Sequence, residues 1–405
     1  MSKCRVTLGL AVGAGLIGCA EGPDPPVHEI RDSAGAEIVE NARPLWRPEE
    51  VWSFGTAPMV RIGVMDGDRA YQFDQVVGAL RLVDGTIVVA DLGTREVRFF
   101  DPQGTMVSRF GGPGEGPGEF QGPTAIGKGL DDRIWLYDFM LRRITWLTAT
   151  GELDGLTTLG PEPPMLHPIG VLADGGFLLK QLWGATQVAE ATETGLRRDP
   201  VAFVVFDVDG ILVDTLGLLP GREVLLTDEG GRGVMNTPPF AKNSVGAVWG
   251  EDVVVGATEA MDLAVMGPEW RTKRKIRIPG LDLTLTREHR EAYVSHRLEE
   301  VPEEDRPGER ARLESMPFPE TRPAFGDLLA DEVGNLWVAE AVLVPKTPKE
   351  WKVFDGSGRW LGVVAAPDRF FPYAVGDDWA LGVELDEMDV EYVVLYPLVK
   401  GAAGA

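Results

Sequence analysis

Residues 100–104 read Phe-Asp-Pro-Gln-Gly, and the same Phe-Asp-x-x-Gly pattern returns at residues 206–210 and 354–358. Each copy follows a run of apolar residues and precedes another. An Asp side chain can accept hydrogen bonds within its own turn, and Gly can adopt the positive φ that a tight turn requires. The pattern therefore predicts three copies of strand, tight turn and strand. Residues 147–151, Leu-Thr-Ala-Thr-Gly, are a weaker fourth copy.

A second landmark, a turn residue followed at once by a β-rich run, recurs six times. The turn residues are Gly85, Asp132, Gly175, Asp252, Asn335 and Asp378. Their successive separations are 47, 43, 77, 83 and 43 residues, so three intervals lie near 45 and two contain an insertion. A further strand follows each run, and five of these six are followed by yet another. The spacing predicts an all-β chain of six units with about four strands each.

The strand that the sixth unit lacks occurs near the beginning of the chain. Residues 59–63, Met-Val-Arg-Ile-Gly, match residues 107–111, Val-Ser-Arg-Phe-Gly, in the first unit. We therefore expect residues 59–63 to lie beside residues 391–396 and to close a ring of sheets. Such closure protects sheet edges that would otherwise favour aggregation.

The composition limits the class of partner. The 405 residues include 63 Asp and Glu against 39 Lys and Arg, which gives a formal net charge of −24. Because nucleic acids are bound by concentrated positive charge, this balance argues against a nucleic-acid partner. Four His and two Cys residues make a zinc site improbable. The Gly-rich run 111–118 lacks the Lys that a phosphate-binding loop requires.

Residues 1–18 predict a signal peptide, because Lys3 and Arg5 precede an uncharged run that is too short to span a bilayer. The run ends at Leu16-Ile17-Gly18-Cys19, which resembles the lipobox of bacterial lipoproteins. The resemblance implies cleavage before Cys19 and lipid attachment to its sulfur. Residues 19–43 are then a tether and N-terminal extension. Ala20 lacks the Asp that such proteins use for inner-membrane retention, so the resemblance favours the outer membrane of the cell envelope.

Residues 109–120, Arg-Phe-Gly-Gly-Pro-Gly-Glu-Gly-Pro-Gly-Glu-Phe, resemble the Gly-rich link between blades of NHL-type β-propellers, especially bacterial lipoprotein versions. The resemblance covers about residues 51–400. It implies a six-bladed β-propeller over residues 44–400, closed by an N-terminal strand. Later links lack the motif, so seven blades stay an alternative.

The insertions are the irregular part of the sequence. Residues 281–323, before the fifth unit, contain an expected helix from about Thr286 to Glu300, which Pro302 ends. The charged, Pro-rich remainder is expected to wrap around the outside or overhang one face. The excess in the third unit falls at residues 184–200 and 218–242. Because loops on such scaffolds often carry function, these insertions are candidate binding elements.

Polar side chains recur where the β-rich runs end, at Asp91, Asp138, Lys180, Glu340 and Glu384. If the units are equivalent, these side chains lie around one face and, with Trp183 from an insertion, are candidates for ligand binding. Carboxylates gathered there could hold calcium. The alternative is that the two Asp side chains pair with nearby arginines, which are Arg95, Arg98, Arg142 and Arg143.

Three functions follow as hypotheses. The first is a lipid-anchored envelope propeller that binds a protein, a glycan or a small ligand, without a cofactor and without catalysis. The second is an enzyme similar to calcium-dependent lactonases or amidating lyases, with a metal in the central channel. The third is an assembly subunit, which would expose a large apolar patch. Since a fold does not fix a function, the residues of the site must decide.

Overall fold

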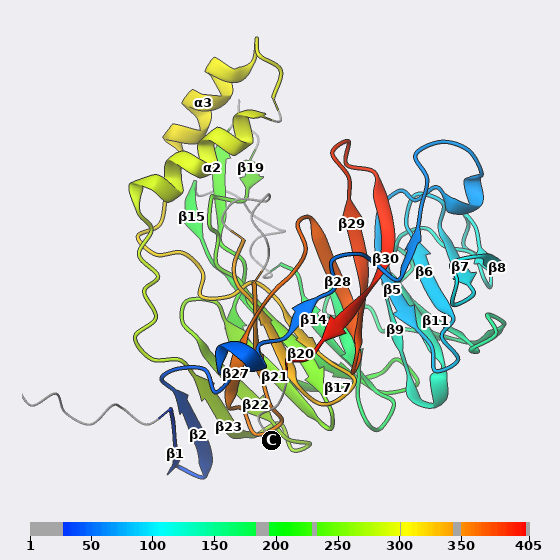
Figure 1. Cartoon of the computed structure of the whole chain (residues 1–405), viewed down its shortest axis with the longest axis horizontal. Coiled ribbons are helices and arrows are strands. Elements are labelled where there is room, and N and C mark those ends of the chain that lie inside the picture. Colours follow the sequence, from blue (N-terminus) through cyan, green and yellow to red (C-terminus); the bar gives the residue numbers. More distant parts are fainter. Residues whose placement is uncertain (1–26, 184–193, 229–232, 300, 343–349, 402–405) are drawn as a thin grey trace, which may run out of the picture.

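The computed structural model describes residues 27–183, 194–228, 233–299, 301–342 and 350–401 (Figure 1). The predicted signal peptide and Cys19 lie outside this range. The described chain is built almost wholly from antiparallel β-sheets, as the sequence predicts, with two α-helices and three single 3₁₀ turns, η1 (Pro48–Glu50), η2 (Arg69–Tyr71) and η3 (Leu130–Asp132).

Sheets 1 to 3 are formed by the first half of the chain, and each has four strands. Sheet 1 contains β5 (Val76–Arg81), β6 (Ile87–Asp91), β7 (Glu96–Phe100) and β8 (Met106–Gly111). Sheet 2 contains β9 (Pro123–Lys128), β10 (Ile134–Asp138), β11 (Arg143–Leu147) and β12 (Leu153–Thr158). Sheet 3 contains β13 (Leu166–Val171), β14 (Phe177–Gln181), β16 (Pro200–Phe206) and β17 (Leu212–Pro220).

Sheets 4 to 6 repeat this order in the second half. Sheet 4 contains β20 (Ser244–Trp249), β21 (Asp252–Ala257), β22 (Asp262–Met266) and β23 (Thr272–Arg277). Sheet 5 contains β24 (Leu328–Ala330), β25 (Leu336–Ala339), β26 (Glu350–Phe354) and β27 (Trp360–Ala365). Sheet 6 contains β28 (Phe370–Val375), β29 (Trp379–Leu385) and β30 (Glu391–Val399), together with β3 (Ser53–Phe54) and β4 (Val60–Ile62).

The sheets lie side by side through their first strands. In chain order, β5 contacts β9, β9 contacts β13, β13 contacts β20, β20 contacts β24, and β24 contacts β28. The first strand of sheet 6, β28, also contacts β5 of sheet 1. Small antiparallel sheets stacked through their first strands are the architecture of a β-propeller.

The Phe-Asp-x-x-Gly motifs form the predicted hairpin turns. Asp101 Oδ1 accepts hydrogen bonds from the backbone N–H groups of Gln103 and Thr105 at 3.0 and 2.8 Å, and Gly104 has a φ of 85°. The turns that begin at Asp207 and Asp355 repeat this geometry. The Phe of each motif is fully buried in the core. The motif therefore ends a core strand and reverses the chain at once.

The N-terminal segment adds strands to the second half of the molecule. The hairpin of β1 (His28–Ser33) and β2 (Ala36–Asn41) extends sheet 4, with β2 parallel to β23. Backbone N–H groups of Leu45 and Trp46 donate to carbonyls of β27 at 3.0 and 2.7 Å. Strand β4 then pairs with β30, as expected for residues 59–63 and 391–396. One extended segment thus covers the outer strands of three consecutive sheets.

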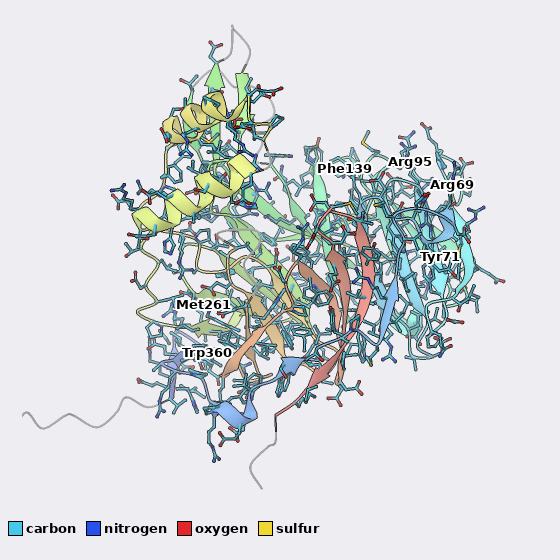
Figure 2. The ribbon with its side chains drawn as sticks, turned by 45° about the horizontal axis from the view of Figure 1, so that its top comes forward. Arg69, Tyr71, Arg95, Phe139, Met261 and Trp360 are labelled. Atoms are coloured by element: carbon cyan, nitrogen blue, oxygen red, sulfur yellow. The ribbon has the colours of Figure 1, made fainter. Side chains whose placement is uncertain are left out.

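The core lies between neighbouring sheets, and tryptophans fill much of it. Trp146 of sheet 2 packs on Phe177 of sheet 3 with ring centroids 5.4 Å apart. Met261 of sheet 4 and Trp360 of sheet 5 belong to one apolar cluster and lie near each other in Figure 2. Wide aromatic side chains suit this position because two twisted sheets leave a broad gap between them.

The insertions lie together at one end of the molecule (Figure 1). Helix α2 (Arg287–Glu299) matches the predicted helix closely. A second helix, α3 (Arg306–Ser315), which the sequence did not predict, lies in the segment that we expected to wrap around the outside or overhang one face. Pro307 is tolerated there because it lies in the first turn of α3, where a helix needs no backbone donor. The other insertion forms a small sheet of β15 (Gly195–Arg197), β18 (Val224–Asp228) and β19 (Gly233–Asn236). Residues 184–193 lie outside the described range.

Candidate functional site

Asp91 and Asp138 end the second strands of sheets 1 and 2, and both side chains are fully buried. Asp91 accepts from the backbone N–H groups of Asp74 and Thr94 at 2.7 and 2.8 Å. Asp138 accepts from the backbone N–H groups of Gln121, Gly122 and Leu141 at 2.7, 3.1 and 2.9 Å. Each carboxylate therefore ties the start of its sheet to the following turn through backbone donors.

The arginines expected beside these carboxylates have other roles. The Arg143 guanidinium donates to the carbonyls of Glu115 and Gly116 at 2.9 and 3.1 Å and to that of Glu119 at 2.5 Å. It thereby holds the Gly-rich link in place. Arg98 is buried and donates to the carbonyl of Gln72 at 2.5 Å.

Glu384 and Glu340 have side-chain partners. Glu384 forms an ion pair with Arg61 of β4 and accepts a hydrogen bond from the Tyr396 hydroxyl. Glu340 forms an ion pair with Arg322, with 3.1 Å between Nη1 and Oε1. It also lies beside Glu350, whose pKa is raised by burial and by the negative charge of Glu340.

The predicted ring of carboxylates does not form a metal centre among the described residues. Within the described ranges, no three Asp, Glu, His or Cys side chains approach closely enough to hold a metal ion. Trp183 is half-buried two residues after β14, next to residues outside the described range. Lys180 is the predicted residue whose side chain donates a hydrogen bond to Asn243, and Asn243 lines a cavity with other polar groups.

Lys180 is buried near the end of β14. Its Nζ donates to the Asn243 side-chain oxygen at 2.9 Å and to the carbonyl of Ser244. Burial, together with the positive charges of Arg222 and Arg198, lowers the pKa of Lys180 to about 8, while Asp327 opposes the shift. Desolvation disfavours the ammonium form, and two neighbouring cations disfavour it further.

Two further titratable groups lie within electrostatic reach of Lys180. His167 is its register partner on β13, and Asp327 directly precedes β24. His167 is exposed to solvent, yet enough protein surrounds it to lower its pKa, with Lys180 as a second cause. Asp327 raises the pKa of both neighbours. Sheet 3 and the segment before sheet 5 therefore contribute polar groups to one region.

A cavity of about 500 Å³ opens beside this cluster. We call it the insertion pocket, and the lining residues used below are Arg222, Phe240, Asn243, Tyr293, Gly326 and Asp327. Its volume falls in the range of about 300–1,000 Å³ that is typical of small-molecule sites. Sheets 4 and 5 supply one wall through the segments before β20 and β24. The two insertions supply the other.

The aromatic wall of the insertion pocket joins the two insertions. Phe240, which follows β19, packs on Tyr293 of α2 with ring centroids 5.4 Å apart, and Phe318 lies against both rings. Phe240 has a φ of 55°, in the left-handed region that bulky residues seldom adopt. Surrounding contacts must hold it there, because such a conformation costs about 1–3 kcal/mol.

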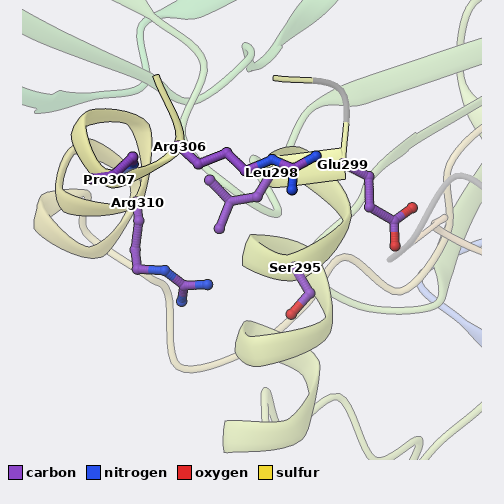
Figure 3. Close-up of a pocket in the computed structure, with 6 residues that line it drawn as sticks. All are labelled: Ser295, Leu298, Glu299, Arg306, Pro307 and Arg310. Carbon is purple, nitrogen blue, oxygen red and sulfur yellow. The ribbon is translucent and has the colours of Figure 1, made fainter. Parts of the chain in front are cut away.

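A second cavity, of about 410 Å³, lies between α2 and α3 (Figure 3). Leu298, Arg306 and Arg310 are among its lining residues. Leu298 also packs with Val294 and Leu313 in a small apolar core that joins the two helices. The Arg306 side chain donates to the carbonyl of Val301 at 3.0 Å. This cavity is therefore a gap within the helical hairpin, apart from the titratable cluster near Lys180.

Exposed apolar side chains occur on the outer strand β17, including Leu212, Val213 and Leu218. The assembly-subunit hypothesis predicts a large exposed apolar patch. These side chains lie on one edge strand of sheet 3, away from the polar groups near Lys180 on β14.

Sequence reasoning missed Arg222, Asn243 and Asp327 because they come from three separate segments. Their positions in the sequence were the one indication. Arg222 lies in the insertion at 218–242, and Asn243 and Asp327 each directly precede the first strand of a sheet. The pairing of His167 with Lys180 also needed the register of β13 and β14, which the sequence does not specify.

Among the described helices, none is long and apolar enough to cross a membrane. No protein-family model matches the chain, and no curated protein matches it. Among solved structures, a member of the DUF4221 family from Bacteroides vulgatus is similar at 13% identity and a TM-score of 0.49, covering 87% of this chain and all of that one. Virginiamycin B lyase from Staphylococcus aureus is similar at 9% identity and a TM-score of 0.42, covering 86% of this chain and all of that one. Likenesses this distant carry no argument about the site.

Proposed function

We propose that this chain is an exported, lipid-anchored β-propeller of the bacterial cell envelope, of the NHL type with six blades, and that it binds a small ligand in the insertion pocket. It acts as a binding module rather than an enzyme.

Six blades are supported by the repeated four-strand order of sheets 1 to 6 and by the circuit of contacts between their first strands. The pairing of β4 with β30 supports closure by an N-terminal strand. The expected insertion before the fifth blade corresponds to α2 and α3, which lie between β23 and β24.

The lipid anchor rests on the sequence at Leu16 to Cys19. Expression in a bacterium with a radiolabelled fatty acid should label the wild-type protein and leave Cys19→Ser unlabelled. The wild type should fractionate with outer membranes and the variant with soluble material. Equal labelling of both proteins, or recovery of the wild type in the soluble fraction, would remove the anchor from the proposal.

The observation that carries the binding function is the insertion pocket itself. Two insertions that the repeat does not require meet over the face of sheets 4 and 5, and they border an open cavity beside a buried lysine. A concave site with aromatic lining and a few convergent polar groups is the usual form of a small-molecule site.

The test is retention of small molecules from an envelope extract by the mature, detergent-solubilised protein, read by mass spectrometry. Gly326→Leu should place an apolar side chain in the pocket and narrow it, and a Cβ at Gly326 has room because it meets its nearest atom only at 3.6 Å. Gly308→Leu is the matched control, since Gly308 lies on α3 with open space around it. Molecules retained by wild type and control but lost by Gly326→Leu support the proposal. An unchanged retained set in all three proteins overturns it.

A further inference from the structure

We infer that the ligand of the insertion pocket carries an anionic group, a carboxylate or a phosphate, on an apolar, ring-containing body, with Arg222 as the residue that binds the anion. This inference rests on the proposed function, because it names the ligand class of the same pocket. It follows from the charges, the partners and the aromatic lining of the described residues.

The first step concerns Arg222. It lies between β17 and β18 and lines the pocket with its side chain exposed. The neighbouring Arg198 is neutralised by an ion pair with Glu259 and donates to the carbonyl of Gly221 at 2.8 Å. Arg222, in contrast, makes no ion pair or side-chain hydrogen bond with any described residue. A guanidinium presents a planar fork of donors that matches a carboxylate or phosphate, so an unpartnered one in a pocket wall is a ready anion site.

The second step concerns the local excess of positive charge. Lys180 lies close enough to Arg222 for the two charges to oppose each other, and Asp327, which lines the pocket, counters the charge of Lys180. The whole chain has a net charge of −24, so a cavity with Arg222 in its wall and the buried Lys180 behind Asn243 differs in sign from its surroundings. A concave site lined by one sign of charge concentrates ligands of the opposite sign. An anion between Arg222 and the Lys180 region would relieve the repulsion.

The third step concerns the apolar body of the ligand. Phe240 and Tyr293 are half-buried, and they form the wall that faces the lining of sheets 4 and 5. Their rings are in contact. The backbone of Phe240 has a positive φ, which places its side chain in this wall. Aromatic faces of this kind stack with planar or ring-containing groups. The pocket therefore offers one recognition element for a charge and another for a ring.

The experiment uses two probes that differ in charge and share a ring system, 2-naphthoate and 2-naphthalenemethanol. Binding to the mature protein is measured by isothermal titration calorimetry. The variants are Arg222→Ala, Phe240→Gly and Gly326→Leu. Glycine is chosen at position 240 because it can adopt the positive φ found there. Arg271→Ala is the control, because its side chain is 86% exposed and does not line the insertion pocket.

We expect 2-naphthoate to bind at least ~10-fold more tightly than the alcohol, the affinity step that corresponds to one further good contact. Arg222→Ala should remove that preference, Phe240→Gly should weaken both probes, and Gly326→Leu should abolish binding. Arg271→Ala should bind as wild type does. Loss of 2-naphthalenemethanol binding in Gly326→Leu would show that the uncharged probe also binds in the insertion pocket.

Three results would overturn the inference. Equal affinity for the two probes, with both lost in Gly326→Leu, would reject the anionic ligand and leave the pocket as a binding site. Failure of 2-naphthoate to bind, or binding that Gly326→Leu does not change, would reject the ligand class altogether. In that case the extract experiment decides separately whether the proposed function survives.

Discussion

Ile62 is the register partner of Val393, and this pair joins the fourth strand of the chain to the last one. Ile62 is 2% exposed and Val393 is fully buried, and both belong to an apolar cluster that also contains Val89 and Phe100 of sheet 1. The side chain of Ile62 therefore packs in the interface between sheets 6 and 1. An early strand of the chain thus contributes to the interface between its last sheet and its first.

Ile62→Ala should destabilise the protein strongly. Removing a buried Ile side chain leaves a cavity and costs about 2–5 kcal/mol in free energy of unfolding. The measurement is urea denaturation followed by tryptophan fluorescence. Met59→Ala, whose side chain is 52% exposed in the same segment, should cost far less. Equal effects of the two substitutions would mean that the pairing of β4 with β30 does not stabilise the fold.

The sequence could predict these strands because their signals are local. Phe100-Asp101 to Gly104 specifies a hairpin turn within five residues, and the match between residues 59–63 and 107–111 needs no knowledge of packing. Helix α3 was missed because Pro307 and a high charge content are typical of irregular segments, whereas its stability comes from Leu313 packing on α2. The insertion pocket could not be predicted, since Arg222, Tyr293 and Asp327 meet only through the relative placement of two insertions and two sheets.

Asp138→Asn should destabilise the fold, although the residue is a predicted ligand-binding candidate. The carboxylate accepts three backbone N–H groups, and the amide would place an NH₂ group against one of these donors. An unsatisfied buried polar group costs about 1–3 kcal/mol. Thermal unfolding of the variant should begin at a lower temperature than that of wild type. The exposed Asp209→Asn is the control, and a Tm of Asp138→Asn equal to that of the control would contradict this structural role.

Calcium should leave the thermal midpoint unchanged. A metal that binds the folded state stabilises it by mass action. However, Asp91 and Asp138 are occupied by backbone donors, while Arg61 and Arg322 pair with Glu384 and Glu340. Differential scanning calorimetry in millimolar calcium and in chelator checks this expectation. A rise in Tm that Glu384→Gln abolishes would restore the lactonase-like hypothesis.

Glu350→Gln should stabilise the protein at neutral pH. Burial and the charge of Glu340 raise the pKa of Glu350 in the folded state above its ordinary value. A carboxyl group with a raised pKa favours folding at low pH, and this contribution is lost as the pH rises through the folded pKa. The Tm difference between variant and wild type should therefore be positive at pH 7 and shrink near pH 4. Glu350 is exposed to solvent, yet enough protein surrounds its carboxyl group to raise its pKa. The control Glu152→Gln, at another exposed position, should show no such trend, and a difference that grows on acidification would reverse the sign of the argument.

Lys180 should make stability increase with pH in the alkaline range. Its pKa is about 8 in the folded protein against an ordinary value of 10.5, so between these values the unfolded state binds more protons. The contribution of Lys180 to the free energy of unfolding therefore rises as the pH increases from about 8 to 10.5. This contribution is lost again when the pH is lowered through the same interval. Raised pKa values of about 12 for Tyr137, Tyr373 and Tyr396 act in the opposite direction. Because unfolded tyrosines ionise near pH 10, measurements between pH 8 and about 9.5 separate the two effects.

Lys180→Met removes the ammonium group and keeps most of the apolar length of the side chain. Urea denaturation at several pH values in this window should give a positive slope of unfolding free energy for wild type and a flatter one for the variant. Lys273→Met is the matched control, since Lys273 is 49% exposed on sheet 4, and it should retain the wild-type slope. If Lys180→Met also retains that slope, the folded protein does not lower the pKa of Lys180. The repulsion between Lys180 and Arg222 would then no longer support an anionic ligand in the insertion pocket.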